Sequence, residues 1–438
     1  MMSTAEWRLT FTNATLHFLV DGVCVCCLYM LSDVFCLTSL VGVFMTYNVL
    51  AFLTQPITGM IADRQFYQHP LLLGLSVVLL SAGVACASAF AAIGNGVLWQ
   101  LLLVAVLIGL GNSLFHVWGG KLTAVVTGND ARAIGTFVAT GALGLAVGML
   151  FHSWWLLFAM LAITVFISIG VMMLFSRGKY IARRTGKSKT TWLCWLVLLL
   201  MMGLVLLRSF VGEVFTSDIA RGTNTIIIIG AVAMAGKMLG GWLVRWMGIL
   251  IAFVLVAVAV AACLLMRSGG QGVLWSGLLV VNLTMAMTLY LANAAMPGRE
   301  GLTFGLLAAT LMPGYMLAQF GATASEAVPG LLLTLIPTIL LELLVLWLLR
   351  EKRADVLWSA VVVNMLTNIP LNLYVTYVSS SFATIAVAEL LIVVVEALWY
   401  MYFIGRVHLA FAYSVLANGV SFFTGLLVQM LYIYILNK

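Results

Sequence analysis

Polar residues along this chain are sparse, and they separate long apolar runs. Runs of about 20 apolar residues, the length of a helix that spans a bilayer, recur along nearly the whole sequence. They predict an all-α polytopic membrane protein. The fifteen expected helices cover residues 14–34, 38–61, 70–91, 97–118, 133–151, 153–175, 191–213, 223–246, 249–267, 272–294, 301–322, 328–349, 356–376, 382–403 and 408–435.

Two polar and basic breaks group these helices. The longest, residues 176–191, divides the first twelve helices into two sets of six. The second, "REKRAD" at 350–355, precedes the last three helices. We therefore expect an N-terminal six-helix bundle, a basic cytoplasmic loop, a C-terminal six-helix bundle and a three-helix appendix. Their expected ranges are 1–175, 176–191, 192–350 and 351–438.

Charge changes this picture by giving it an orientation. Only 8% of the 438 residues are charged, and the net charge is +7. With the N-terminus in the cytoplasm, 16 of the 21 lysines and arginines lie on the inner side and three on the outer side. The basic balance therefore indicates membrane topology, not a nucleic-acid partner, and places the C-terminus outside.

The seven cysteines lie mostly within apolar runs and form no CxxC pair. We interpret them as small buried hydrophobic residues, with a metal or redox site at Cys24, Cys26 and Cys27 as the less favoured alternative. The sequence has no P-loop, HExxH or G-x-S-x-G motif in a usable context. We therefore expect neither an enzyme nor a protein with a metal or organic cofactor.

The first apolar run carries two ionisable residues in the stretch "HFLVD". His17 and Asp21 are four residues apart, so they share one face of a helix. A second pair with the same spacing, Asn112 and His116, lies in the helix predicted over 97–118. Ionisable residues inside a membrane are costly, and this makes both pairs candidates for function.

A short motif follows the second predicted helix in "QPITGMIADRQ", residues 55–65. Gly59 permits a close helix approach, Asp63 can face a helix N-terminus in the opposite half, and Arg64 can bridge to a carboxylate. Such contacts would form a latch between helices on the cytoplasmic side, and the alternative is an ordinary polar turn. The corresponding stretch 236–248 keeps the glycines and lacks the aspartate, which indicates an internal repeat with a weaker second latch.

The Gly59-x-x-x-Asp63-Arg64 pattern resembles the loop between helices 2 and 3 of the major facilitator superfamily. The stretches "HFLVD", "GLGNSLFHVWGG", "LLRSF" and "MPGREGLTFGL" look like the fosmidomycin-resistance efflux branch of that superfamily. The resemblance implies a proton-driven exporter in a bacterial inner membrane. The chain departs from the branch where Met149 replaces a proline after Gly141, Gly144 and Gly148, and also after His116. These departures leave the substrate and the direction of transport open.

In this fold, as the resemblance implies, helices 1, 4, 7 and 10 line a central cavity. His17, Asp21 and His116 then meet at one depth. We expect Asp21 to carry the coupling proton, with His17 and His116 tuning or relaying it. The alternative is a buried hydrogen-bonded trio that only joins two helices.

Further polar residues lie in the second half. Arg208 could bind an anionic substrate, or it could pair with Glu213 or Asp218. We also count Asn112, Glu213 and Asn282 as candidate substrate ligands. Pro313 and Gly314 are expected to kink the eleventh helix and to take part in gating.

The appendix has its own polar stripe, made of Asn364, Asn368, Asn372, Glu389, Glu396 and Asn418. Asn364, Asn368 and Asn372 recur every four residues and so form one amide face. The stripe could pack the appendix on itself or on the rest of the chain, because amides hydrogen-bond across helices. It could instead bind another membrane protein through 356–438, or form a separate ion path.

The function that we expect is proton-coupled secondary transport, with export of a small polar or amphipathic compound by alternating access. One alternative is import of a small organic anion. The other is a non-transporting receptor or membrane-complex scaffold that uses the appendix.

Overall fold

The computed structural model describes residues 2–35, 37–64, 70–94, 97–176, 191–219, 224–319, 338–377 and 381–436. Within these residues the regular structure is helical, and eleven helices are long and apolar enough to cross a membrane. The prediction of an all-α polytopic membrane protein is confirmed.

The helices have the following bounds in chain order. They are α1 (Thr4–Val34), α2 (Leu37–Asn48), the π-helical turn η1 (Val49–Leu53), α3 (Gln55–Arg64), α4 (Leu71–Ile93), α5 (Leu98–Val126), α6 (Ala131–Leu150), α7 (Trp154–Ser176), α8 (Trp192–Asp218), α9 (Thr225–Met247), α10 (Ile249–Leu265), the short 3₁₀ turn η2 (Arg267–Gly269), α11 (Gln271–Ala295), α12 (Glu300–Ala309), α13 (Leu311–Gln319), α15 (Ala354–Tyr377), α16 (Phe382–Ile404) and α17 (Val407–Leu436). A further apolar helix, Thr338–Leu348, precedes α15.

Two helices extend beyond their predicted ends. α1 begins at Thr4 instead of residue 14, because Ser3 and Glu6 form a capping box in which each side chain binds the other's backbone N–H. α5 continues to Val126 instead of ending at 118. Lys121, which the topology count places in a cytoplasmic loop, is therefore helical and only 4% exposed.

Two predicted helices are interrupted near a proline. The range predicted as 38–61 divides into α2, η1 and α3, and Pro56 lies at the start of α3. The predicted range 301–322 divides into α12 and α13, and α12 ends at Ala309, four residues before Pro313. A proline ring opposes the carbonyl four residues earlier, which is why the helix stops there. The interruption predicted at Pro313 is therefore present.

The chain forms two compact units. The larger unit contains residues 1–188 and 200–315, and the smaller unit contains residues 189–199 and 316–438. The basic loop predicted over 176–191 lies almost entirely outside the described residues. The predicted division into two six-helix bundles stays a prediction.

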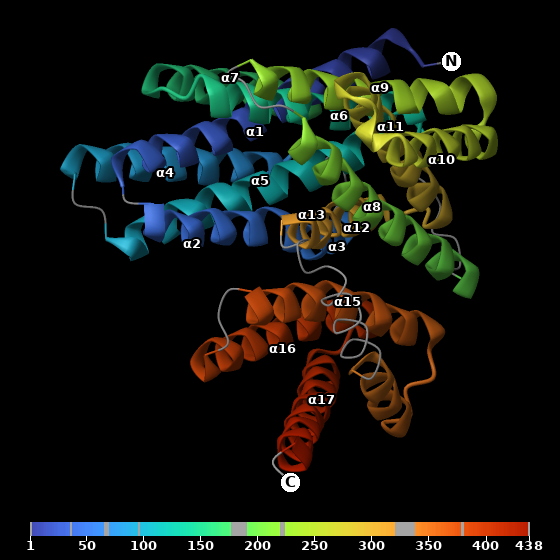
Figure 1. Cartoon of the computed structure of the whole chain (residues 1–438). Helices are drawn as coiled ribbons and strands as arrows, with labels where there is room; N and C mark the ends of the chain where they lie inside the picture. The colour runs from blue at the N-terminus through green and yellow to red at the C-terminus, as the bar shows by residue number, and fades with distance from the viewer. Residues whose placement is uncertain are drawn as a thin grey trace. The chain divides into compact units, whose positions relative to one another are not determined.

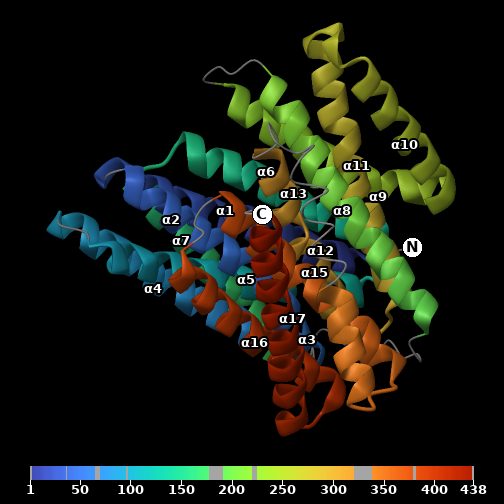
Figure 2. The same ribbon diagram turned by 60° about the horizontal axis from the view of Figure 1, so that its bottom comes forward.

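In the larger unit α1 is buried along most of its length and packs against α5, α6 and α7 (Figure 1). α9, α10 and α11 lie side by side, as Figure 2 shows, and α9 also packs closely on α6. α12 contacts α3, and each of its ten residues is buried. These contacts place the polar residues of α1, α3, α5 and α12 inside the unit.

The smaller unit contains α15, α16, α17 and the helix Thr338–Leu348. α16 packs on both α15 and α17. The buried indole of Trp399 on α16 donates a hydrogen bond to the backbone oxygen of Ser359 on α15, at 3.0 Å. The three last helices end within a few residues of the positions expected from the apolar runs.

Candidate functional site

Small residues on α6 let it approach α1 closely. A Cβ atom at Gly141 would meet the Asp21 carboxylate and the His17 ring, and one at Gly144 would meet the backbone oxygen of Phe18. The Thr140 hydroxyl adds a hydrogen bond of 2.5 Å to the backbone oxygen of Ala14. The glycine spacing in the sequence therefore makes room for two polar side chains between the helices.

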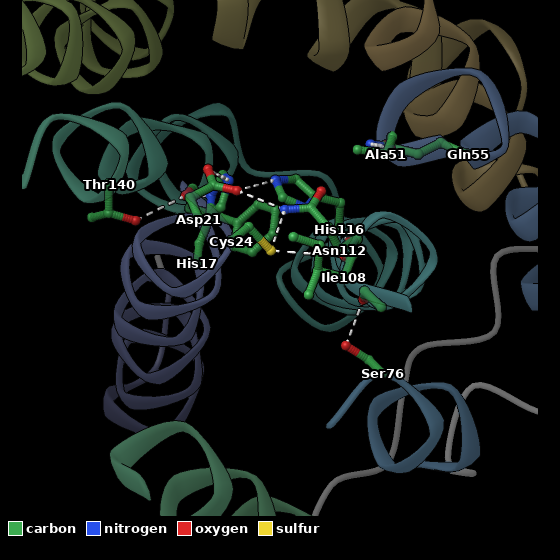
Figure 3. A network of polar contacts seen from close by, with 12 residues as sticks. His17, Asp21, Cys24, Ala51, Gln55, Ser76, Ile108, Asn112, His116 and Thr140 are labelled. Carbon is green, nitrogen blue, oxygen red and sulfur yellow. Dashed lines mark hydrogen bonds and ion pairs between the residues drawn. The ribbon is translucent and has the colours of Figure 1, made fainter. Parts of the chain in front are cut away.

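The predicted trio is assembled. Figure 3 shows His17 and Asp21 of α1 pointing toward Asn112 and His116 of α5. His17 Nε2 lies 3.2 Å from Asp21 Oδ2, and His116 Nε2 lies 3.4 Å from Asp21 Oδ1. The Asn112 amide donates to Asp21 Oδ1 at 3.0 Å. Both carboxylate oxygens thus face ring nitrogens, and His17 and Asp21 are only 5% and 7% exposed.

The outer ring nitrogens fix the tautomers. His17 Nδ1 lies 2.6 Å from the backbone oxygen of Phe137, and His116 Nδ1 lies 3.0 Å from the backbone oxygen of Asn112. A carbonyl oxygen only accepts, so both Nδ1 atoms carry hydrogen. If the rings were neutral, both Nε2 lone pairs would point at an ionised carboxylate.

That arrangement would be repulsive at both contacts. At least one proton must therefore lie on an Nε2 atom or on the Asp21 carboxyl. The two rings are also edge to face, with centroids 4.5 Å apart. The geometry provides three neighbouring atoms between which one proton can be exchanged.

These three facing atoms lie within 4.8 Å of one another, a spacing that would also suit a metal ion. The surroundings are unfavourable for a divalent cation. Lys237 on α9 lies within electrostatic range of both Asp21 and His116, and Arg208 lies within range of Lys237. A proton adds less positive charge near these cations than a divalent metal would.

Asp63 forms the contact expected of a latch. Its Oδ1 and Oδ2 accept the backbone N–H groups of Gly301 and Leu302 at the start of α12, at 2.9 and 2.8 Å. The carboxylate thus satisfies free N–H groups and interacts favourably with the helix dipole. A Cβ atom at Gly59 would meet the backbone of Gly301, so both glycines are needed for this close approach.

Lys121 also contacts Asp63, and the sequence analysis did not predict this contact. Its Nζ lies 3.0 Å from Asp63 Oδ1 and donates to the backbone oxygen of Ala62 at 2.5 Å. Both side chains of the pair are nearly inaccessible, at 4% and 1% exposure. Lys121 lies in a polar, glycine-containing end of an apolar run, so its residue type alone indicated a loop. Arg64 is the last residue of α3.

The stretch corresponding to the latch in the second half makes a different contact. A Cβ atom at Gly241 on α9 would meet the backbone of Ala131 at the start of α6. The guanidinium of Arg132 lies over the rings of Trp7 and Trp242, at 5.8 and 5.4 Å from their centroids. Its charge is also paired with Asp130 at 2.6 Å. A cation in contact with two stacked indoles is present where the sequence lacks the aspartate.

Arg208 of α8 is buried, at 8% exposure, and its Nε and Nη2 atoms have no hydrogen-bond partner among the described residues. Asp218, one partner considered from the sequence, instead pairs with Arg267. A buried guanidinium whose N–H groups lack acceptors is energetically unfavourable, unless another group accepts hydrogen bonds from them.

The other predicted substrate ligands are dispersed. Asn112 belongs to the Asp21 cluster. The Asn282 amide donates to the backbone oxygen of Leu278, one turn earlier on α11, at 2.8 Å. Glu213 is half-buried on α8. Of the three predicted ligands in this paragraph, the described contacts bring Asn112 to the Asp21 carboxylate.

Pro313 and Gly314 lie where α8 and α13 approach one another. A Cβ atom at Gly314 would meet the backbone oxygen of Leu206, and Ser209 Oγ donates to the backbone oxygen of Leu311 at 2.8 Å. The helix interruption is therefore packed beside the segment of α8 that carries Arg208.

The appendix stripe is partly assembled. Asn364 and Asn368 hydrogen-bond to each other at 3.0 Å, and the Asn418 amide donates to Glu396 at 2.5 Å. Glu389 is half-buried on α16. The Asn372 side chain lies outside the described residues. Glu342, which contacts Asn364 at 2.6 Å, was not predicted as part of the stripe, because its partner lies on another helix.

Comparison by sequence gives no relative, because neither a protein-family model nor a curated protein matches the chain. Comparison with solved structures does find proteins of similar fold. The Escherichia coli fucose:proton symporter FucP carrying N162A is similar with a TM-score of 0.56 and 13% identity, over 75% of this chain and 93% of that one.

Two further structures agree. FucP in the outward conformation has a TM-score of 0.54 and 14% identity, over 71% of this chain and 89% of that one. A bacterial homologue of the iron transporter ferroportin, outward-facing with soaked iron, has a TM-score of 0.51 and 15% identity, over 87% of this chain and 100% of that one. This multi-pass membrane protein therefore has the fold of the major facilitator superfamily of transporters.

Proposed function

We propose that the chain is a proton-coupled secondary transporter that moves a small anionic compound by alternating access. The observation that carries this proposal is Arg208, a buried guanidinium with unpartnered donors, in the same unit as the Asp21 cluster. A phosphonate or carboxylate would satisfy the guanidinium through paired hydrogen bonds. FucP, described as a proton symporter, has a similar fold.

Lys237 supplies the coupling in this proposal. It lies within electrostatic range of Asp21 on one side and of Arg208 on the other. An ionised Asp21 attracts Lys237 and repels an incoming anion. A proton on the Asp21 cluster removes both effects, so proton and anion binding favour one another.

This sign of coupling favours symport, in which the anion and the proton enter together. The residues resembling the fosmidomycin-resistance branch favour export in exchange for protons instead. We keep export of a small polar or amphipathic compound as the second candidate, because the "HFLVD" stretch on which the resemblance rests carries two residues of the proton site.

The Asp63 latch supports alternating access. It joins α3 to α12 through two backbone hydrogen bonds and to α5 through a buried ion pair. In the proposed topology, with a cytoplasmic N-terminus and an external C-terminus in a bacterial inner membrane, these contacts close the cytoplasmic end. Release of the anion into the cytoplasm requires them to separate.

The test uses purified protein in liposomes that contain a pH-sensitive dye. A proton gradient is imposed, and small phosphonates, carboxylates and neutral amphipathic compounds are added in turn. We expect an anion to produce proton movement in the wild type and none in Asp21→Asn. The sign of the movement separates symport from antiport.

Asp33→Asn is the matched control. Asp33 also lies on α1 and is 3.2 Å from a histidine, His152, but its side chain is 54% exposed. Its proton movement should equal that of the wild type. Arg208→Gln should lose response to anions, whereas Arg267→Gln should keep it. Full coupling in Asp21→Asn would overturn the proposal, and no response to any compound would favour the scaffold alternative, with a protein partner bound through residues 356–438.

A further inference from the structure

The smaller unit contains two carboxyl groups that are completely buried. Glu342 lies on the helix Thr338–Leu348 and Glu396 lies on α16, and both are 0% exposed. Neither belongs to the Asp21 cluster or to the latch, because both of those lie in the larger unit.

α15 joins the two carboxyl groups. The Asn364 amide donates to Glu342 Oε2 at 2.6 Å, and the Thr367 hydroxyl donates to Glu396 Oε1 at 3.0 Å. Asn364 and Thr367 are three residues apart and so lie on one face of the helix. Both carboxyl groups therefore face the same turn of α15.

Polar donors already occupy three of the four carboxyl oxygens. Asn418 of α17 donates to Glu396 Oε2 at 2.5 Å, in addition to the two contacts from α15. The fourth oxygen, Glu342 Oε1, has no hydrogen-bond partner among the described residues. The same is true of the Tyr400 hydroxyl, which is buried and within electrostatic range of both carboxyl groups.

Among the described residues, no lysine, arginine or histidine forms an ion pair with Glu342 or Glu396. Two titratable groups on α16, Glu389 and Tyr400, are within electrostatic range of the pair. Glu389 adds negative charge if it is ionised. Two buried carboxylates without a cation are strongly unfavourable, so the pair needs a positive charge from elsewhere.

A proton fits the free position better than a metal ion does. A metal cation binds several oxygen ligands, as the six to eight of calcium illustrate. Here, among the described residues, one carboxyl oxygen and one tyrosine hydroxyl lack a hydrogen-bond partner. A proton requires a single oxygen and turns Glu342 into a donor.

We propose that Glu342 and Glu396 form a second proton-binding site, separate from the Asp21 cluster, that exchanges one proton with solvent. The amides and hydroxyl around it hold the remaining ionised carboxylate. The polar stripe of the appendix then has a chemical role besides joining helices. This proposal does not depend on transport by the larger unit.

Infrared difference spectroscopy of the full chain in liposomes tests this site, because a protonated carboxyl group has a carbonyl stretch that a carboxylate lacks. Wild-type protein is compared with the double variant Glu342→Gln and Glu396→Gln. We expect a carbonyl band that disappears at alkaline pH, shifts in D2O, and is absent from the double variant. Glu351→Gln is the matched control in the same unit, because Glu351 is paired with Arg353, and this variant should keep the band.

Thr367→Val gives a second readout if the double variant does not fold. Loss of this donor makes ionised Glu396 less favourable, so the band should persist to higher pH than in the wild type. An identical pH response in wild type, the double variant and Thr367→Val would overturn the proposal. A band removed at constant pH by sodium chloride and not by choline chloride would also overturn it, by assigning the site to sodium.

Discussion

The two proton sites proposed for this chain surround their carboxyl groups with different chemistry. In the larger unit, Asp21 lies 3.2 and 3.4 Å from the Nε2 atoms of His17 and His116. In the smaller unit, the donors that reach Glu342 and Glu396 from the described residues are asparagine and threonine side chains. An imidazole can carry the proton as a cation, but an amide cannot.

This difference determines where the proton lies. Beside the histidines the proton can sit on a ring while Asp21 stays ionised, and the added positive charge then offsets the attraction of Asp21 for Lys237. Between the glutamates the proton must lie on a carboxyl group. The arrangement at Asp21 suits coupling to an anionic substrate. At Glu342 and Glu396 the bound proton only removes the negative charge of one carboxyl group.

Asp63 is a third buried carboxylate and marks the other extreme. Lys121 and two backbone N–H groups give it a fixed counter-charge and two donors. Such a carboxylate needs no proton, and its role is to hold two helices together. The groups beside each buried carboxyl group therefore determine whether it binds a proton: histidines can share one, a lysine replaces it, and amides or hydroxyls leave it on the carboxyl group.

The largest expected effect comes from converting the Asp21 cluster into a copy of the glutamate site. In the double variant His17→Asn and His116→Asn, we expect Asp21 to carry its own proton at neutral pH. A new carbonyl band should appear in the infrared spectrum, and proton-driven transport should fall to that of protein-free liposomes.

His152→Asn removes the more exposed histidine beside Asp33 and should change neither measurement. Transport at the wild-type rate in the double variant would show that the imidazoles only join α1 to α5.

Removing the Asp63 carboxylate, and with it the ion pair to Lys121, should produce the next largest effect. Asp63→Ala removes the carboxylate that lies 3.0 Å from the buried Lys121 ammonium, and breaking a buried ion pair costs about 3–5 kcal/mol. We expect this loss in the free energy of unfolding, measured by chemical denaturation in detergent.

The double variant Asp63→Ala and Lys121→Met should recover part of the loss, because no charge is then left unpaired. Strictly additive losses would contradict a direct interaction between the two residues.

Steric disturbance of the Asp21 cluster should have an intermediate effect. A Cβ atom introduced by Gly141→Ala meets both Asp21 and His17, and such overpacking costs about 1–3 kcal/mol. Proton coupling should weaken as the two side chains separate. Gly170→Ala on α7 is the control, since a Cβ atom there meets nothing within 4 Å. Equal stability of the two variants would contradict the close approach of α1 and α6.

The smallest effect is expected at the ion pair of Glu351 and Arg353, in which the arginine is half exposed and its charge is screened by solvent. Arg353, which is 48% exposed, hydrogen-bonds Glu351 and lowers the pKa of that carboxyl group. The pair therefore stabilises the chain at neutral pH, and this contribution disappears as the pH falls through the lowered pKa.

Glu351→Gln should cost at most about 1 kcal/mol at neutral pH. Its melting temperature should approach that of the wild type only as the pH falls below about 4, the usual range for glutamate, because the pKa of Glu351 is lowered. A difference that grows in acid would contradict the sign of this shift.

Much of the fold could be predicted because helix length and hydropathy are local properties. The last three helices were placed within a few residues, and the interruption at Pro313 followed from a missing N–H group. The end of α5 and the start of α1 were misplaced. In both cases polar residues that suggest a loop are accommodated by a cap or by a partner distant in sequence.

The candidate site was predicted in part. His17 and Asp21 share a helix face by spacing alone, but the pairing with His116 rested on a family resemblance. Arg208 was identified, whereas its unpartnered state was not, because Glu213 and Asp218 were plausible partners nearby in sequence. Lys121 and Glu342 were missed, because their partners Asp63 and Asn364 lie on other helices.

The sequence by itself determined which segments are helical and apolar, and which rare polar residues they carry. These follow from local hydropathy, spacing and backbone chemistry. The tertiary structure alone decided which charges meet. Asp21 receives two histidines, Asp63 receives a lysine, and the two glutamates receive neither. The reason is physical: the electrostatic environment of a buried carboxyl group depends on residues brought close from distant helices, and their positions in the sequence do not specify those distances.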